Sequence, residues 1–274
     1  MLNQDNQIIS TPKEKIVLSL RDRLIVYGGV FLIIVTAWSY MLYMGWAMNN
    51  MHLVDMWMPP NTGSESWHIY DFYMLFVMWF VMMMAMMMPS VTPMVLMFTI
   101  VNKGKQNKGL PYSPTFIFLS GYLVAWALFS IVASAIQYPL HESGLLNPMM
   151  NSRSYLFSGS ILIIAGLYQW TPLKEACLSK CRSPLSFLMT SWQEGHIGAL
   201  KLGVHHGLYC VGCCWALMMV LFSVGVMNML WVFLITGFVL LEKLGPTTSV
   251  YLRFITGLLL IVWGSYWISL HHWQ

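Results

Sequence analysis

The sequence predicts an all-α fold, a polytopic transmembrane bundle of about seven helices with the N-terminus inside the cell. Hydrophobic residues make up 58% of the 274 positions and charged residues only 9%. A soluble domain carries roughly one-quarter charged residues, so this chain has too little charge to cover a water-exposed surface. A chain this apolar buries most of its length in lipid or against other membrane helices.

Seven apolar runs approach the roughly twenty helical residues that cross a bilayer. They span residues 24–46, 72–96, 115–137, 155–170, 199–223, 226–241 and 250–270. The fourth and sixth runs are short, and a six-span arrangement with the fourth run interfacial or re-entrant stays open.

Basic residues collect in alternate loops, which predicts the orientation because positively charged short loops stay in the cytoplasm. They precede the first run (Lys13, Lys15, Arg21, Arg23), follow the second (Lys103, Lys105, Lys108) and surround the loop after the fourth (Lys174, Lys180, Arg182, Lys201). We therefore expect a cytoplasmic N-terminal segment, residues 1–22, and a single transmembrane domain, residues 23–272. The long inner loop, 171–198, is expected to contain a short interfacial helix.

The net charge is small, at +4, and the aromatic residues are not interleaved with basic clusters. Nucleic acid is therefore not an expected partner, whereas membrane lipid is. The first outer loop carries His52, His68 and Asp71 together with methionines, and is interpreted either as a metal-collecting loop or as a plain hydrated loop. Its methionines are Met48, Met51, Met56 and Met58.

The five cysteines form two groups, which indicates metal binding or redox chemistry rather than structural disulfides, because the cytoplasmic side keeps thiols reduced. Cys177 and Cys181 lie on the inner loop, and Cys210, Cys213 and Cys214 lie in the fifth run. They could join one site, or the inner pair could pass metal to or from a soluble carrier, which is the role we favour from the sequence.

Helical spacing places further donors beside the fifth-run cysteines. His206, Cys210, Cys214 and Met218 recur at i,i+4 and so share one helix face, with His205 adjacent. In the second run, Met74, Met78, Met82 and Met86 follow the same spacing. Thiolate and thioether are soft ligands suited to Cu(I), and if these two runs pack together, a ladder of soft donors crosses the bilayer.

Other interpretations stay open. Methionine fills gaps in apolar cores, and cysteine packs as a small apolar residue at helix interfaces. Gly203 and Gly207 form a small-xxx-small pattern that would bring a neighbouring helix close to the cysteine face. Glu242 and Lys243 are interpreted as a capping or interfacial charge pair, with Glu242 alternatively a ligand or proton acceptor.

Several spaced motifs resemble a bacterial family of predicted metal-binding integral membrane proteins, a domain of unknown function. They are MWFVMMMAMMMP, YQWTPLKEACLSKCRSP, GVHHGLYCVGCCWALMM, GVMNMLW and LLEKLGP. The resemblance runs from about Asp71 to the C-terminus and implies metal binding through the matching residues. These are Cys177, Cys181, His206, Cys210, Cys213 and Cys214, with Met82, Met86 and Met87 in the second run.

We therefore predict a multi-pass protein of the bacterial inner membrane that binds, transfers or transports copper as Cu(I), with zinc or haem as alternative cofactors. Whether it is also an enzyme stays open, and a non-enzymatic role is favoured. The predicted metal ligands are Cys177, Cys181, His205, His206, Cys210, Cys213, Cys214, Met78, Met82, Met86 and Met218. Partners would be a soluble metal carrier or a larger membrane complex. The alternatives are a thiol-redox or electron-transfer protein and a non-catalytic subunit of a membrane complex.

Overall fold

The computed structural model describes residues 20–55, 57–60, 67–107, 109, 111–147, 150–245 and 248–271. The predicted cytoplasmic segment up to residue 19, Met56 and Lys108, and the domain end at residue 272, lie outside these ranges. Over the described residues the chain is helical, and the β-pairing is confined to one isolated bridge between Leu146 and Ser152. The predicted all-α fold is therefore confirmed.

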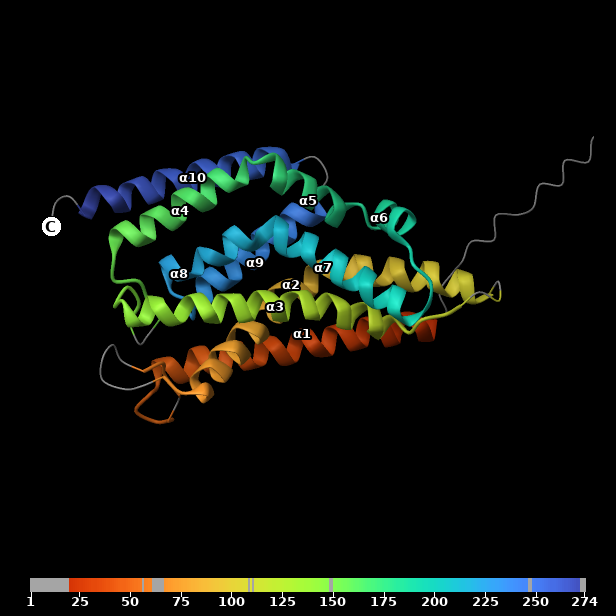
Figure 1. Ribbon diagram of the computed structural model, residues 1–274, viewed down its shortest axis with the longest axis horizontal. Helices are drawn as coiled ribbons and strands as arrows, with labels where there is room; N and C mark the ends of the chain where they lie inside the picture. Colours follow the sequence, from red (N-terminus) through yellow and green to blue (C-terminus); the bar gives the residue numbers. More distant parts are fainter. Residues whose placement is uncertain are drawn as a thin grey trace, which may run out of the picture.

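The helices lie side by side along the long axis of the molecule (Figure 1). They are α1 (Leu20–Asn49), α2 (Ile69–Asn107), α3 (Thr115–Glu142), α4 (Tyr155–Gln169), α5 (Pro172–Arg182), α6 (Pro184–Ser191), α7 (Gly195–Met219), α8 (Leu221–Val224), α9 (Met229–Leu244) and α10 (Thr248–His271). In this view α4 and α10 form one side, α1 lies at the other, and α7 and α9 run between them.

Every predicted apolar run is helical, but fewer runs than predicted are long enough to cross a membrane. Among the described residues, five helices pass by length and composition, and a sixth passes if α4 and α5, bent by 64°, count as one span. The predicted sixth run is α9, whose 16 residues extend about 24 Å at 1.5 Å per residue. Length and composition thus support five or six spans instead of seven.

Glycines bring α3 and α7 into close contact, as the Gly203–Gly207 pattern predicts. A Cβ atom on Gly203 would lie 2.0 Å from the carbonyl oxygen of Phe118, and one on Gly121 would lie 2.2 Å from that of Leu200. The two backbones can approach this closely because neither residue has a side chain. This contact places α3 directly beside the cysteine face of α7.

The inner loop folds into two helices, α5 and α6, where one was predicted. Thr171 caps α5 by accepting a hydrogen bond from the Lys174 amide at 3.3 Å, and Pro172 occupies the first turn. Both features are typical of helix N-termini. Helix α5 packs on α7, so the inner-loop cysteines are held against the fifth predicted run.

Candidate metal centre

All five cysteines come together where α5 packs on α7. We call Cys177, Cys181, Cys210, Cys213 and Cys214 the cysteine cluster; all five are free thiols, and the three on α7 are buried. Cys181 interacts with the thiols of Cys210 and Cys213. Cys177 lies against the α carbon of Gly212, where a Cβ atom would be 2.9 Å from its sulfur. The structure therefore joins the two sequence groups in one place.

Cys210 lies at the centre of this cluster. Its Sγ is 3.1 Å from the hydroxyl of Tyr122 on α3 and 2.9 Å from the ammonium nitrogen of Lys243 on α9. The thiols of Cys213 and Cys214 donate to the Cys210 carbonyl oxygen at 3.1 and 2.9 Å. Residues from three other helices therefore surround the Cys210 sulfur: Tyr122 from α3, Lys243 from α9 and Cys181 from α5.

Lys243 reaches from the last turn of α9 into the protein interior. Its Nζ donates to Ser90 Oγ at 3.0 Å and lies 3.9 Å from Met87 Sδ, besides its contact with Cys210. A buried ammonium needs a nearby negative charge, and neither the serine nor the thioether can carry one. Cys210 can, because a neighbouring cation favours the thiolate form of a cysteine.

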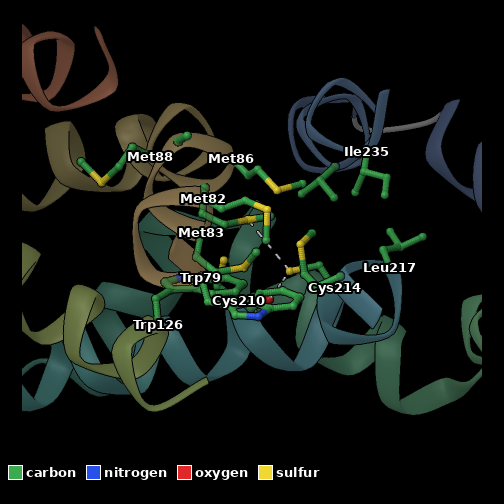
Figure 2. Close-up of a cluster of buried hydrophobic side chains, with 14 of the residues drawn as sticks. Trp79, Met82, Met83, Met86, Met88, Trp126, Cys210, Cys214, Leu217 and Ile235 are labelled. Carbon is green, nitrogen blue, oxygen red and sulfur yellow. Dashed lines mark hydrogen bonds between the residues drawn. The ribbon is translucent and has the colours of Figure 1, made fainter. Parts of the chain in front are cut away.

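Methionines of α2 face the cysteines of α7 (Figure 2). Met82, Met83 and Met86 lie across from Cys210 and Cys214 in the close-up, and the sulfur of Met87 is 4.0 Å from that of Cys214. All of these side chains are buried. The second and fifth predicted runs therefore touch through their side chains, which is the condition for a ladder of soft donors.

A proline lies inside α2 beside the methionines. Pro89 lies within the helix, between Met88 and Ser90, and it has no amide hydrogen to donate to the Ala85 carbonyl. The Ser90 hydroxyl donates to the Met87 carbonyl oxygen at 2.9 Å. Pro89 and Ser90 therefore shape the part of α2 from which Met87 contacts α7 and Ser90 contacts Lys243.

The two histidines differ in their positions. His206 is buried among the rings of Phe118, Tyr122 and Phe187, and its Nδ1 has no hydrogen-bond partner among the described residues. His205 is exposed and packs against Phe187 and Tyr209. His206 is therefore a candidate donor one turn from Cys210, whereas His205 lies apart from the cysteine cluster.

The remaining predicted ligands lie further along the bundle. Met218 is fully buried one turn beyond Cys214, and Met78 lines a cavity about two turns from Met86. In the first outer loop, Asp71 is already bound, because its carboxylate accepts from the indole of Trp57 and from the amide of His68, both at 2.8 Å. His52 and His68 are exposed, and the described residues of this loop hold no group of three His, Cys, Asp or Glu side chains arranged to bind a metal ion.

The acidic and basic residues near the cluster do not pair as the sequence suggests. The carboxylate of Glu242 accepts from Lys174 Nζ, at 2.8 Å to each oxygen, and the two side chains are 2% and 0% exposed. Lys174 also donates to Gln169, and Arg182 donates to the Glu242 carbonyl oxygen. The predicted pairing of Glu242 with Lys243 is wrong, because Lys174 occupies the carboxylate and leaves Lys243 to turn toward Cys210.

Sequence reasoning missed four residues at the site, namely Tyr122, Lys174, Lys243 and Ser90. A signal existed for Lys243, which lies in the apolar helix α9, since ionisable residues within apolar segments are functional candidates by default. Tyr122 could be found by its position next to Gly121, which faces the small-residue pattern of α7. Ser90 has no comparable signal in the sequence.

The thiols do not yet converge on a single point. Across the described part of the chain, no group of three or more His, Cys, Asp or Glu side chains is arranged to hold a metal ion. Cys213 and Cys214 point back to a backbone carbonyl, and a change of χ1 rotamer would release both. The arrangement can thus supply soft donors in pairs, with thioethers beside them.

The fold and the site together define an all-helical protein with several helices that could cross a membrane and a buried cluster of soft sulfur donors. Residues 76–267, more than two-thirds of the chain, match a family described as PpoB2, copper chaperone. The chain belongs to this copper chaperone family. No curated protein and no solved structure matches the chain significantly.

The family match confirms the expected link to copper. The matched region starts within α2 and ends within α10, so it contains the cysteine cluster and Lys243. It excludes α1 and the first outer loop. The assignment of particular metal ligands stays a prediction.

Proposed function

We propose that this protein is a multi-pass membrane copper chaperone that holds Cu(I) as cargo at the cysteine cluster and passes it to a partner. One observation carries the proposal: cysteines from α5 and α7 and methionines from α2, far apart in sequence, meet around Cys210. Two sulfur atoms 4.0 Å apart, those of Cys214 and Met87, can both reach one soft ion, because metal–sulfur bonds are about 2.3 Å long. Thiolate and thioether together favour Cu(I) over harder ions.

In this proposal the ion binds two or three sulfur donors. Cys210, with Cys181 or Cys214, supplies thiolates, and Met87 supplies a neutral thioether. Two thiolates and one Cu(I) carry a net charge of −1, which the Lys243 ammonium offsets at 2.9 Å. Such compensation matters in an apolar interior, where an unpaired charge is costly.

Cys177 and Cys181 are the proposed exchange point. Both are partly exposed, whereas the α7 cysteines are buried, so an ion can move between a soluble carrier and the interior by exchange from one thiolate to the next. The inner membrane of a bacterium is the proposed location, with this end of the bundle facing the cytoplasm.

Elemental analysis of the detergent-purified protein tests the proposal. After growth in copper-supplemented medium, we expect near-stoichiometric copper in the wild type and a loss of tightly bound copper in the variant with Cys210→Ser and Cys214→Ser. The control variant carries Met97→Leu and Met229→Leu, which leave the cysteine cluster intact and should retain the metal. Equal copper content in both variants would contradict the assignment.

The contact between Cys181 and Cys210 supports thiol-redox exchange as a second candidate. A thiolate beside Lys243 is a good nucleophile, and Cys181 is a neighbouring thiol with which it would form a disulfide. A copper-free protein whose cluster cycles between dithiol and disulfide with a partner would favour this function over copper transfer.

A further inference from the structure

A second group of sulfur atoms lies at the end of the bundle opposite α5 and α6. A cavity of about 170 Å³ is bordered by α1, the first outer loop, α2, the loop after α3 and the turn before α9. Half of its twelve lining residues are methionines: Met44, Met48, Met74, Met78, Met150 and Met227. Methionine makes up 24 of the 274 residues in the whole chain, so this concentration is high. We call these six residues the methionine pocket.

The backbone beside this pocket includes a non-glycine residue with a positive φ angle. Met150 adopts a positive φ of 58°, which non-glycine residues rarely do. Its amide donates to the Asn147 carbonyl at 2.8 Å, and its carbonyl accepts from the Val226 amide at 3.3 Å. These two bonds hold the Met150 side chain at the cavity together with the turn that carries Met227.

A glycine permits that turn to lie against the Met150 loop. Gly225 has a φ of 100°, and a Cβ atom there would lie 2.2 Å from the side-chain oxygen of Asn151. Unbranched methionine commonly fills irregular gaps in cores. Here the methionines surround a cavity instead of filling it. One of them, Met150, lies at the cavity in a backbone conformation that is unfavourable for a non-glycine residue.

The pocket wall adds charge and aromatic surface. Asp55, which is exposed, supplies a carboxylate at the rim, and Tyr40, Tyr43 and Trp57 supply rings. The indole of Trp57 is fixed by its bond to Asp71. Thioethers are neutral, so a bound monovalent ion keeps its charge, and a nearby carboxylate and aromatic faces favour a cation.

Methionines of α2 connect this pocket to the cysteine cluster. Met78 lines the pocket, and Met82 and Met86 follow at successive turns, all with 2% exposure or less. Eight residues of helix span about 12 Å. The last of these side chains lies across from the α7 cysteines (Figure 2).

We propose that the methionine pocket is a second, weaker Cu(I) site, which exchanges the ion with the other side of the membrane and with the cysteine cluster through the α2 methionines. This inference rests on the proposed copper function. Thioether donors bind Cu(I) without losing a proton, so the ion can leave them more easily than it leaves thiolates. The ligand class is a soft monovalent cation, Cu(I) or its redox-inert substitute Ag(I).

Anaerobic titration of the full-length protein in detergent with Cu(I), against a chromophoric chelator, tests this inference. The wild type should bind a second, weaker equivalent after the first. In the variant with Met78→Leu and Met150→Leu, the second equivalent should bind at least about tenfold more weakly, which corresponds to about 1.4 kcal/mol. The control, with Met41→Leu and Met94→Leu, changes two buried methionines outside the pocket and should keep it.

A cysteine-free variant, with all five cysteines replaced by serine, separates the two sites. It should still bind one weak equivalent of Cu(I) or Ag(I), and adding the Met78→Leu and Met150→Leu changes should remove it. If this variant is unstable, X-ray absorption of the wild type at one and two equivalents replaces it, and the second ion should show sulfur ligands that the methionine variant lacks. A wild type that binds a single equivalent, at the cysteines, would overturn the proposal for the methionine pocket and leave the proposed function intact. Tight copper binding in the cysteine-free variant would instead overturn the proposed site at the cysteine cluster.

Discussion

Lys243 illustrates how a single side chain can decide the chemistry of a buried site. Its ammonium has three donors, and these face Cys210, Ser90 and Met87. Glu242, its neighbour in sequence, is bound to Lys174. Cys210 is therefore the group that can carry the charge opposite Lys243, and a dithiolate copper complex would need this cation.

Replacing Lys243 by methionine keeps an unbranched side chain, shorter by one atom, and removes its charge. We expect Cu(I) binding to weaken by about 10- to 100-fold, the usual effect of losing a partner that supports metal ligands. Competitive titration of the purified variant measures this. Lys103→Met, which removes a partly exposed lysine, serves as the control. An unchanged Cu(I) affinity in Lys243→Met would contradict the role of Lys243 as a counter-ion.

At the residue scale, the sequence singled out the cysteines that the structure brings together and missed the lysine that contacts Cys210. Cys210, Cys213 and Cys214 stand out because they lie within five positions of an apolar helix. Lys243 does not, since it lies at a helix end beside a glutamate, where a surface pair is the simpler interpretation. Which side chain reaches the interior depends on Lys174, 68 positions away from its partner Glu242, and sequence spacing does not show such contacts.

At the scale of helices, the crossing of α3 and α7 determines whether Tyr122 can reach Cys210. Gly203→Ala would place a Cβ atom 2.0 Å from the Phe118 carbonyl oxygen, so the helices must separate. We expect a lower Tm and weaker copper binding, because backbone atoms cannot move aside as a flexible side chain can. Thermal unfolding in detergent and metal titration measure the two effects.

Gly237→Ala is the matched control for this substitution. Gly237 lies within α9, and no atom lies within 4 Å of the position of an added Cβ. Alanine there should stabilise the helix by about 0.5–1 kcal/mol, because glycine is the poorer residue in helix interiors. Equal destabilisation by both substitutions would show that the α3–α7 contact is not what Gly203 provides.

The buried pair of Lys174 and Glu242 joins α5 to α9 and so holds the inner-loop cysteines in place. Lys174→Met leaves the Glu242 carboxylate without its partner in an apolar setting, and such a loss costs about 3–5 kcal/mol. Replacing both residues with methionine should recover most of that stability. Chemical or thermal unfolding of the single and double variants measures the difference, and a double variant as unstable as the single one would contradict this explanation.

At the scale of the whole molecule, the sequence predicted the helices better than their packing. Apolar runs identify the seven longer helices, α1, α2, α3, α4, α7, α9 and α10, because hydrophobic length is a local property. The position of α5 against α7 could not be predicted, since it depends on Thr171 and Pro172 turning the chain and on Lys174 finding Glu242. For this reason the sequence left open whether Cys177 and Cys181 join the α7 cysteines, whereas the structure places all five in one cluster. The exchange role of this pair stays a proposal.

This packing makes a further prediction about the intact protein. Cys181 interacts with the thiols of Cys210 and Cys213, so the oxidant diamide should link α5 to α7 by a disulfide from Cys181 to one of these cysteines, with the two electrons and two protons passing to diamide. Mass spectrometry of protease fragments identifies the linked pair. In the proposed function Cu(I) occupies the same sulfur atoms, so preloading with one equivalent should prevent the link. Lys243→Met should slow it because less thiolate is present. A disulfide that forms equally fast with and without copper would show that the ion binds elsewhere, and the shared position of the five cysteines would then serve redox chemistry instead of copper transfer.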